Sequence, residues 1–488
     1  DGGGELVLQK AESVSEKPLL AAINMELETG SPIYVMRPGE FSGFAIVLIN
    51  TTGQEINADA SFTFSDIFEN SFRIERKLTL KPGRTERLPV KLPEDLKMGI
   101  WYVTCQLSSP GETSTQKVRS FACMQPAGPT KERLEIGKPT DFLYGICNAP
   151  DRWSVFAAQM DALSAAAVGA KVFRTATPWS YISRKEGEWD YGVFDRLVSV
   201  FGEQGIELQA LIAGVPRWAI DPDAPLRKDQ IDPRGSKMPK LKPFREYVYK
   251  TALRYKGKIR LWEIGNEPDH PGFAAYGPDG QAKLQTAAFE EIRKADPSIR
   301  VMTGGFAGIT GNSFRYQYET LGASRGKFDL HAIHLHGPFS SYHRQIDNEL
   351  RELQSKLGIE NIPWYPNETA HHSTGGNEKV QAESLYTKLV FSRARGAVGF
   401  TWYNMRDVGF NEMDNEHNYG MQKADFYPKA VFPAYAALVN TFRGFAFHSQ
   451  LSLQQGEFGF LFRNGNDFLL AGWKTGDAVN SGGCYSLE

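Results

Sequence analysis

The chain has no run of about 18 apolar residues, the length that a membrane-spanning helix needs. It also has little net charge, because 55 Lys and Arg stand against 57 Asp and Glu, for a formal charge of −2. That balance offers no electrostatic argument for nucleic acid or for an acidic membrane surface. We therefore expect neither a nucleic-acid partner nor a membrane partner.

Cysteine is scarce as well, with four in 488 residues, too few for a disulfide scaffold. Cys105 and Cys123 lie on consecutive strand-like segments, and two interpretations stay open: a cross-strand bridge, or two small buried hydrophobes. The first residues, DGGGELVLQK, resemble neither a signal peptide nor a cytosolic start. They favour a mature, exported protein, either secreted or periplasmic.

The pattern of apolar and polar residues changes along the chain. Residues 1–125 show short alternating strands around Pro-Gly turns, which is typical of an antiparallel β-sandwich. Residues 126–139 are rich in Pro, Gly and charge and predict a linker. Residues 140–445 alternate strand-like and helical segments. Residues 446–488 contain a hairpin with Asn-Gly in its turn, which either completes the sandwich or begins a further β domain.

The central region predicts an α/β fold. Eight strand–helix alternations over roughly 300 residues suit a (β/α)8 TIM barrel, flanked by the N-terminal sandwich and the C-terminal β segment. The expected strands are 142–148, 171–177, 206–214, 259–267, 299–306, 328–336, 362–368 and 397–404.

Two glutamates stand at the expected strand ends. The stretch LWEIGNEPDH ends the fourth strand on Glu267, and WYPNETAHHS ends the seventh on Glu368. Alternation along a strand puts Glu263, Gly265 and Glu267 on one face. The same alternation puts Trp364, Pro366 and Glu368 on one face. Because barrel active sites lie at the C-terminal strand ends, both catalytic carboxylates should meet there.

Paired carboxylates suit glycoside hydrolysis. One carboxyl group protonates the leaving oxygen, and the other attacks the anomeric carbon when the two are about 5–5.5 Å apart. Glu263 faces inward but lies deeper, so we expect a buried carboxylate paired with Arg or Lys.

These motifs resemble those of retaining glycoside hydrolases of clan A, the 4/7 superfamily, over about residues 140–445. The resemblance implies that Glu267 is the acid/base, that Glu368 is the nucleophile, and that Asn266 holds the sugar 2-hydroxyl. Arg174, in VFRTATPWSYI, matches the arginine that contacts the nucleophile. His334 and His336, in FDLHAIHLH, match a His-x-Tyr motif in which His336 replaces the tyrosine. The motifs are reminiscent of families 39 and 79 without matching either closely.

The remaining candidates would bind the substrate, a carbohydrate. By the same resemblance Trp402 stacks on the sugar. Trp179, Trp218 and Asn148 follow strands and either contact sugar or pack in loops. Four cations could meet a uronate or be solvated loop charges: Arg217, Arg234, Lys237 and Arg406.

Other functions remain possible. A metal-dependent barrel hydrolase would use two histidine motifs that supply His331, His334, His336, His371 and His372. A non-catalytic sugar-binding protein could share the scaffold, and transglycosylation shares the covalent intermediate. We expect no cofactor and no metal. The sequence leaves open the sugar, the linkage, exo or endo action, and the oligomeric state.

Overall fold

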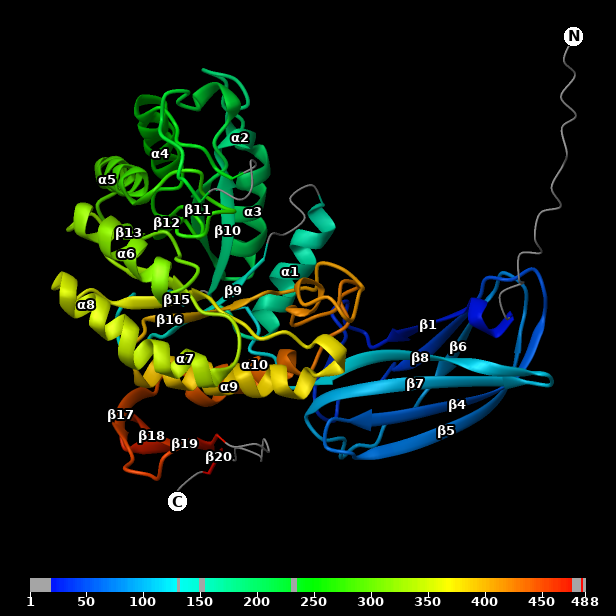
Figure 1. The fold of residues 1–488 in the computed structure, drawn as a ribbon. Helices are drawn as coiled ribbons and strands as arrows, with labels where there is room; N and C mark the ends of the chain where they lie inside the picture. The colour runs from blue at the N-terminus through cyan, green and yellow to red at the C-terminus, as the bar shows by residue number, and fades with distance from the viewer. Residues whose placement is uncertain (1–18, 130–131, 149–153, 230–234, 476–483, 486–488) are drawn as a thin grey trace, which may run out of the picture. The chain divides into compact units, whose positions relative to one another are not determined.

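A computed structural model describes residues 19–129, 132–148, 154–229, 235–475 and 484–485. The chain divides into two compact units, Asp1–Cys123 and Met124–Glu488 (Figure 1). The boundary lies two residues from the predicted end of the sandwich at 125.

The first unit is built from two antiparallel sheets, with strand orders β1-β3-β6 and β2-β8-β7-β4-β5, in which only the short β2–β8 pair is parallel. Alternate residues of β4 are buried, as expected for strands that cover one core with one face. Cys105 and Cys123 are buried free thiols, so the small-hydrophobe interpretation holds. The elements are η1 (Leu19–Ala22), β1 (Ile23–Glu28), β2 (Val35–Met36), β3 (Ala45–Asn50), β4 (Ile56–Asp66), β5 (Ser71–Leu80), β6 (Thr85–Pro89), β7 (Gly99–Ser109) and β8 (Glu112–Cys123).

The second unit alternates parallel strands with helices, and all eight predicted strands are present. The strands are β9 (Leu143–Cys147), β10 (Val172–Pro178), β11 (Glu207–Ala213), β12 (Leu261–Ile264), β13 (Arg300–Met302), β14 (His331–His334), β15 (Trp364–Glu368) and β16 (Gly399–Tyr403). The helical elements are α1 (Val155–Ala167), α2 (Trp179–Ile182), α3 (Gly192–Glu203), η2 (Arg217–Ala219), α4 (Leu241–Arg254), α5 (Pro278–Ala295), α6 (Gly311–Ala323), α7 (Phe339–Gln345), η3 (Ile346–Leu350), α8 (Arg351–Leu357), η4 (Thr374–Gly376), α9 (Glu378–Ala394), η5 (Glu416–Asn418) and α10 (Val431–Phe442).

The parallel strands form a six-stranded sheet, β13-β12-β11-β10-β9-β16, and a two-stranded sheet, β14-β15. Isolated parallel bridges join Met302 to Leu330 and Thr369 to Trp402, so β14 lies beside β13 and β15 lies beside β16. The helices lie on the outside of these strands (Figure 1). All strands therefore point their C-terminal ends in one direction.

The core at the N-terminal ends of these strands is apolar. Leu143, Val172, Leu261 and Tyr365 belong to one buried cluster. Two residues of the predicted linker, Leu134 and Ile136, pack against that cluster. This segment therefore covers the end of the sheet rather than only joining two units.

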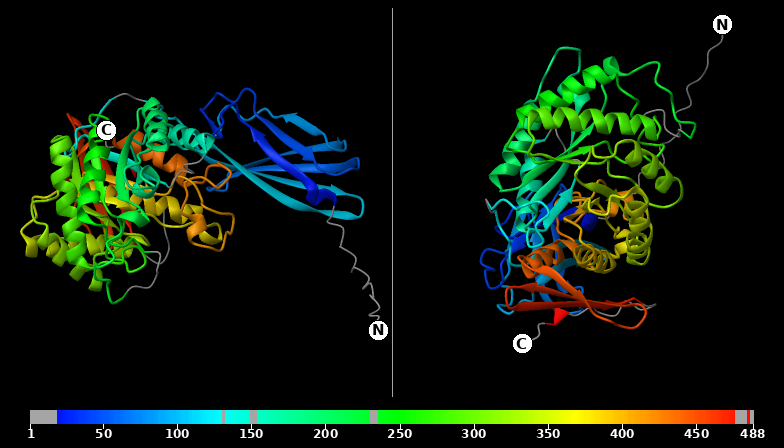
Figure 2. Two further views of the ribbon diagram at one scale, coloured as in Figure 1. Left: turned by 90° about the horizontal axis from the view of Figure 1, so that it is seen from above. Right: turned by 90° about the vertical axis from the view of Figure 1, so that its left-hand side faces the viewer.

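The C-terminal strands form a separate antiparallel sheet, β17-β18-β19-β20, from β17 (Ala446–Gln450), β18 (Glu457–Asn464), β19 (Asp467–Lys474) and β20 (Cys484–Tyr485). Its aromatic side chains meet those of the helices: Phe458 contacts Phe339 of α7, and Phe460 contacts Phe391 of α9. Figure 2 shows this sheet, in orange and red, as a layer beside the helices. The alternative in which these residues complete the N-terminal sandwich is wrong, because they belong to the second unit and pair among themselves. None of the described helices is both long and apolar enough to span a membrane.

Candidate active site

Glu267 lies in a turn just after β12. The strand ends at Ile264, three residues earlier than predicted, although Asn266 still bridges to Gly305 and the Glu267 N–H donates to the Gly305 carbonyl at 2.8 Å. Glu267 has a φ of +45°, a left-handed conformation that costs about 1–3 kcal/mol in a residue with a side chain. The guanidinium of Arg227 holds this turn by donating to the carbonyls of Pro268 and Asp269, each at 3.1 Å.

Glu368 ends β15, but the predicted alternation fails along this strand. Its register with β14 shifts, so that Ile333 pairs with Pro366 and His334 with Glu368. Asn367 is therefore an extra residue, and a β-bulge resets which face the side chains take. Tyr365 shares the inner face instead of Trp364, whose indole donates outward to the Arg395 carbonyl at 3.0 Å.

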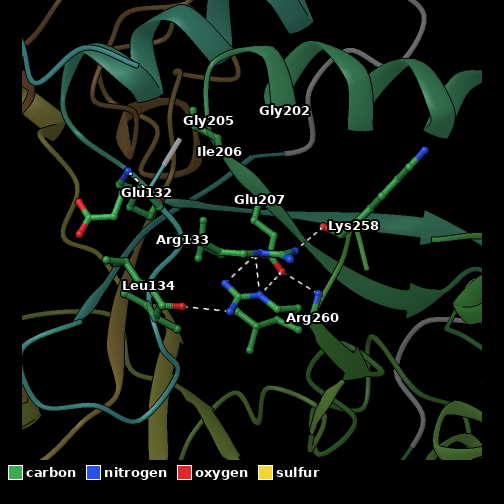
Figure 3. A pocket seen from close by; sticks show the side chains of 13 residues that line it. Glu132, Arg133, Leu134, Gly202, Gly205, Ile206, Glu207, Lys258 and Arg260 are labelled. Atoms are coloured by element: carbon green, nitrogen blue, oxygen red, sulfur yellow. Dashed lines mark hydrogen bonds and ion pairs between the residues drawn. The ribbon is translucent and has the colours of Figure 1, made fainter. Parts of the chain in front are cut away.

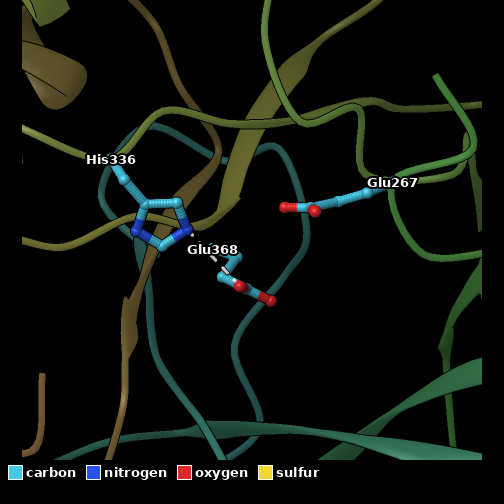
Figure 4. Close-up of side chains that lie close together, drawn as sticks. All are labelled: Glu267, His336 and Glu368. Carbon is cyan, nitrogen blue, oxygen red and sulfur yellow. Dashed lines mark ion pairs between the residues drawn. The ribbon is translucent and has the colours of Figure 1, made fainter. Parts of the chain in front are cut away.

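The two carboxylates approach each other. One atom each from Glu267, His336 and Glu368 lies within 4.8 Å of the other two (Figure 4). Figure 4 shows the carboxylates of Glu267 and Glu368 converging, with the ring of His336 on the Glu368 side. The ends of β12, β14 and β15 thus supply three ionisable groups to one small space.

Arg174 of β10 links the carboxylates of the site. Its guanidinium forms a two-point ion pair with Glu263, with N–O distances of 2.7 and 3.0 Å. It also donates to Glu368 at 2.5 Å and to the side-chain oxygen of Asn266 at 2.7 Å. Because Arg174 is 3% exposed, these contacts are shielded from water.

Glu263 anchors Arg174, as the sequence predicts for a buried, paired carboxylate. It also accepts from Gln209 and from the Gly305 N–H, each at 3.0 Å. Burial alone would raise the pKa of Glu263, but the charge of Arg174 outweighs it and lowers the pKa to about 2. Gly305 has no room for a side chain, because a Cβ there would lie 2.0 Å from His334 Nε2 and 2.7 Å from Glu263.

His334 lies between the carboxylates. Its Nδ1 is 2.8 Å from a Glu267 oxygen and 3.9 Å from a Glu368 oxygen. Burial alone would lower the pKa of His334, but the negative charge of Glu368 and hydrogen bonds to Glu263 and Glu267 raise it to about 9. The imidazole is therefore a cation at neutral pH.

The ionised form of Glu368 is strongly favoured. Burial would raise its pKa, but the positive charges of His334 and Arg174 and the contact with His336 hold that pKa well below its usual range. His336 Nε2 lies 3.4 Å from the second oxygen of Glu368. An ionised carboxylate with its charge held in place can act as a nucleophile.

Tyr403 and Tyr419 form an aromatic wall beside His336. The ring centroid of His336 lies 5.7 Å from that of Tyr403 and 5.6 Å from that of Tyr419, and the two tyrosine centroids are 5.5 Å apart. Neither tyrosine was predicted from the sequence. The position of Tyr403 could have been predicted, because it follows Trp402 in the strand and alternation puts the two side chains on opposite faces.

The other predicted sugar contacts lie elsewhere. Trp402 is fully buried, and so is Trp179, which stacks on Tyr247 at 5.0 Å. Sugar stacking does not fit side chains that solvent cannot reach, so we replace Trp402 by Tyr403 as the candidate aromatic. Trp218 donates to the Ser183 carbonyl at 2.9 Å and is only partly exposed.

Asn148 faces α1 rather than the carboxylates. Its amide donates to Asp161 at 3.0 Å, and Asp161 also accepts from Arg406 at 3.1 Å. Arg406 is therefore paired rather than a free charge for a uronate. Arg234, another candidate for a uronate, lies outside the described residues.

Cys147 is a further residue that the sequence analysis did not place at the site. Its sulfur lies 3.3 Å from the guanidinium of Arg174 and 3.7 Å from Glu368. Burial raises the pKa of this thiol to about 12, so it remains protonated. Alternation from Leu143 through Gly145 would have predicted its inward position.

The histidine motifs separate in space. His331 faces away, toward Gln317 of α6 at 3.0 Å, while His371 contacts the His372 carbonyl at 2.9 Å. Within the described part of the chain, the group suited to hold a metal is Glu267, His336 and Glu368. A metal there would occupy the two carboxylates themselves.

A cavity of about 280 Å³ lies at the opposite ends of the strands (Figure 3). Glu207 pairs there with Arg133 and Arg260, and Arg260 also donates to the Leu134 carbonyl at 3.0 Å. These bonds hold the linker segment against the strands. The cavity is remote from Glu267 and Glu368, because its lining includes the first residues of β11 and β12.

Comparison with known proteins agrees with this geometry. Residues 147–294 match the family model of beta-galactosidases of glycoside hydrolase family 42. A family 39 glycoside hydrolase from Bacteroides cellulosilyticus WH2 aligns with a TM-score of 0.63 at 15% identity, over 92% of this chain and 90% of that one. The chain is therefore similar to a glycoside hydrolase family model over residues 147–294, and in fold to a family 39 glycoside hydrolase. Its individual family is not assigned by these matches.

A second structural neighbour is a monomeric beta-xylosidase from Caulobacter crescentus CB15. It aligns with a TM-score of 0.53 at 17% identity, over 73% of this chain and 77% of that one. No curated protein matches the sequence. At these identities the solved structures establish likeness of fold and not of substrate.

Proposed function

We propose that this glycosidase cleaves an O-glycosidic bond of an oligo- or polysaccharide by double displacement with retention, on a closed (β/α)8 barrel. The observation that carries the proposal is the approach of Glu267 and Glu368 to within 4.8 Å at the ends of two parallel strands. That separation supports retention, because inverting enzymes hold their two carboxyl groups about 6.5–9.5 Å apart to admit a water molecule.

In the first step Glu267 donates its proton to the glycosidic oxygen while Glu368 attacks the anomeric carbon. The C–O bond breaks, the alcohol leaves, and a glycosyl ester forms on Glu368. In the second step Glu267, now a carboxylate, removes a proton from water. That water attacks the anomeric carbon and releases Glu368 as the carboxylate.

The neighbouring residues support these roles. Arg174 and His336 contact different oxygens of Glu368 and orient the carboxylate. Arg174 holds the side-chain oxygen of Asn266, and the amide nitrogen, which has no hydrogen-bond partner among the described residues, would donate to a sugar hydroxyl. Tyr403 and Tyr419 supply an aromatic wall for the sugar ring.

A panel of aryl glycosides tests this proposal. Glu368→Gln should abolish release, and Glu267→Ala should lower it by about 10²–10⁴-fold for poor leaving groups. With a good leaving group, azide should accelerate Glu267→Ala and give a glycosyl azide of the substrate's anomeric configuration. Glu360→Gln, an exposed change before β15, serves as the control. Proton NMR of the first product should show the retained anomer, and an inverted product would refute the double displacement.

The same panel separates the alternatives. Activity that EDTA removes and zinc restores would favour the metal-dependent hydrolase. Binding of a sugar without turnover would favour a non-catalytic protein, and transfer to added alcohol in place of water would indicate transglycosylation.

A further inference from the structure

Helix α9 carries a buried lysine beside the proposed active site. Lys388 is fully buried, yet it forms no ion pair with a carboxylate among the described residues. Burying a charge without a counter-ion costs several kcal/mol, so a lysine at such a position needs strong hydrogen bonds.

The acceptors of Lys388 belong to two strand ends. Its Nζ lies 2.9 Å from the Ala370 carbonyl, 3.3 Å from the Leu335 carbonyl and 3.4 Å from the Thr369 hydroxyl. The ring of Tyr342 lies 5.1 Å away and adds a cation–π contact. All three donors of the ammonium therefore have an acceptor.

These acceptors flank the proposed catalytic groups. Leu335 stands between His334 and His336, and Thr369 directly follows Glu368. The Gly337 N–H also donates to the Ala370 carbonyl at 3.0 Å, so the two segments are joined directly as well. Lys388 thus connects the backbone that carries His336 to the backbone that carries Glu368.

We propose that Lys388 is a positioning residue, which sets the distance and angle between His336 and Glu368 by holding the Leu335 and Ala370 carbonyls. The inference rests on the proposed function for its catalytic consequence, but the geometry it describes can be measured without turnover. Apolar packing of α9 could not do the same, because it offers the two carbonyls no donor.

The test compares Lys388→Met with Ser392→Ala in the full chain. Ser392 is also buried on α9, one turn later, and its hydroxyl bonds the Lys388 carbonyl and the Tyr342 hydroxyl rather than a strand end. One readout is the ¹³C chemical shifts of the His336 ring at constant pH, measured by NMR with ¹³C-labelled histidine and assigned by the signals missing in His336→Asn. The other is kcat and KM on the best aryl glycoside.

Lys388→Met should move the ring signals of His336 and lower kcat by about 10²-fold, the effect of misplacing a catalytic group by about 1 Å, with KM nearly unchanged. Ser392→Ala should change neither. A folded Lys388→Met whose His336 signals do not move would overturn the inference, whatever its activity. If the His336 signals move in Lys388→Met but Glu368→Gln keeps full activity, the positioning stands and the proposed function is refuted. If Lys388→Met does not fold, Lys388→Gln replaces it, because its amide keeps two N–H donors.

Discussion

Replacing Glu263 by Gln tests how much the buried ion pair between Glu263 and Arg174 stabilises the fold. The substitution keeps the shape of the side chain and removes the negative charge that faces Arg174, with N–O distances of 2.7 and 3.0 Å in the wild type. Arg174 would remain buried beside a neutral amide. Breaking a buried ion pair by removing one partner typically costs about 3–5 kcal/mol.

The pKa of Glu263 gives a second route to the magnitude. Its pKa falls from 4.5 to about 2 on folding. Since one pKa unit corresponds to about 1.4 kcal/mol, the ionised carboxylate contributes roughly 3 kcal/mol to the free energy of unfolding. A lowered carboxylate pKa means that this contribution is complete above about pH 5 and is lost as the pH falls from about 4.5 toward 2.

Urea unfolding monitored by tryptophan fluorescence measures the effect. Eight of the nine tryptophans lie after residue 124, so the signal reports mainly on the second unit. Glu263→Gln should lose about 3 kcal/mol at pH 7, and this deficit should shrink at pH 4. Glu188→Gln breaks an exposed pair with Lys185 and should stay within about 0.5 kcal/mol. An equal stability of Glu263→Gln and wild type at pH 7 would refute the reasoning.

Three further outcomes are expected. The pKa of His334 is raised to about 9, so its charged form stabilises the fold. In urea titrations the free energy of unfolding of wild type should exceed that of His334→Gln by its full amount below about pH 6.5, and this excess should decline by about 3 kcal/mol by pH 9. An excess that does not change with pH would contradict the cationic imidazole. Burial lowers the pKa of Lys388 from 10.5 to about 7, so the unfolded chain takes up a proton between these values. The unfolding free energy of wild type relative to Lys388→Met should therefore rise over that range by at most about 1.4 kcal/mol per pH unit, and a fall would contradict it. Tyr403→Ala should raise KM about tenfold through loss of an aromatic contact with the sugar. Tyr318→Ala, on the exposed face of α6, should leave KM unchanged. Equal KM values for Tyr403→Ala and wild type would exclude Tyr403 from the sugar site.

Much of the fold follows from local pattern. The eight parallel strands each show a short apolar run followed by a helical segment, and these patterns depend on neighbouring residues alone. The position of Glu267 followed in the same way, because Asn266, Glu267 and Pro268 cannot continue a buried strand. The identity of Arg174 as the partner of Glu368 came from a family resemblance rather than from spacing.

The errors arise where distant segments decide the conformation. Nothing in WYPNE shows that Asn367 is an extra residue, because the bulge exists only in the pairing of β15 with β14. That shift reversed the predicted faces of Trp364 and Tyr365. Trp402 was misplaced because the resemblance assigned the sugar contact to a tryptophan, whereas the strand turns Tyr403 toward His336.

Helix α9 holds the loops around Glu368 through hydrogen bonds to their main-chain carbonyls. Besides Lys388, the Gln381 amide on the same face, seven residues earlier, reaches the carbonyls of Asn418, Tyr419 and Gly420. All of these anchors except the Thr369 hydroxyl are carbonyls, which every amino acid supplies. The side chains of the loops around Glu368 can therefore change during evolution or in engineered libraries without loss of anchorage. A one-residue insertion between Gln381 and Lys388 would instead rotate these two side chains by about 100° relative to each other and release one of the two groups of loops.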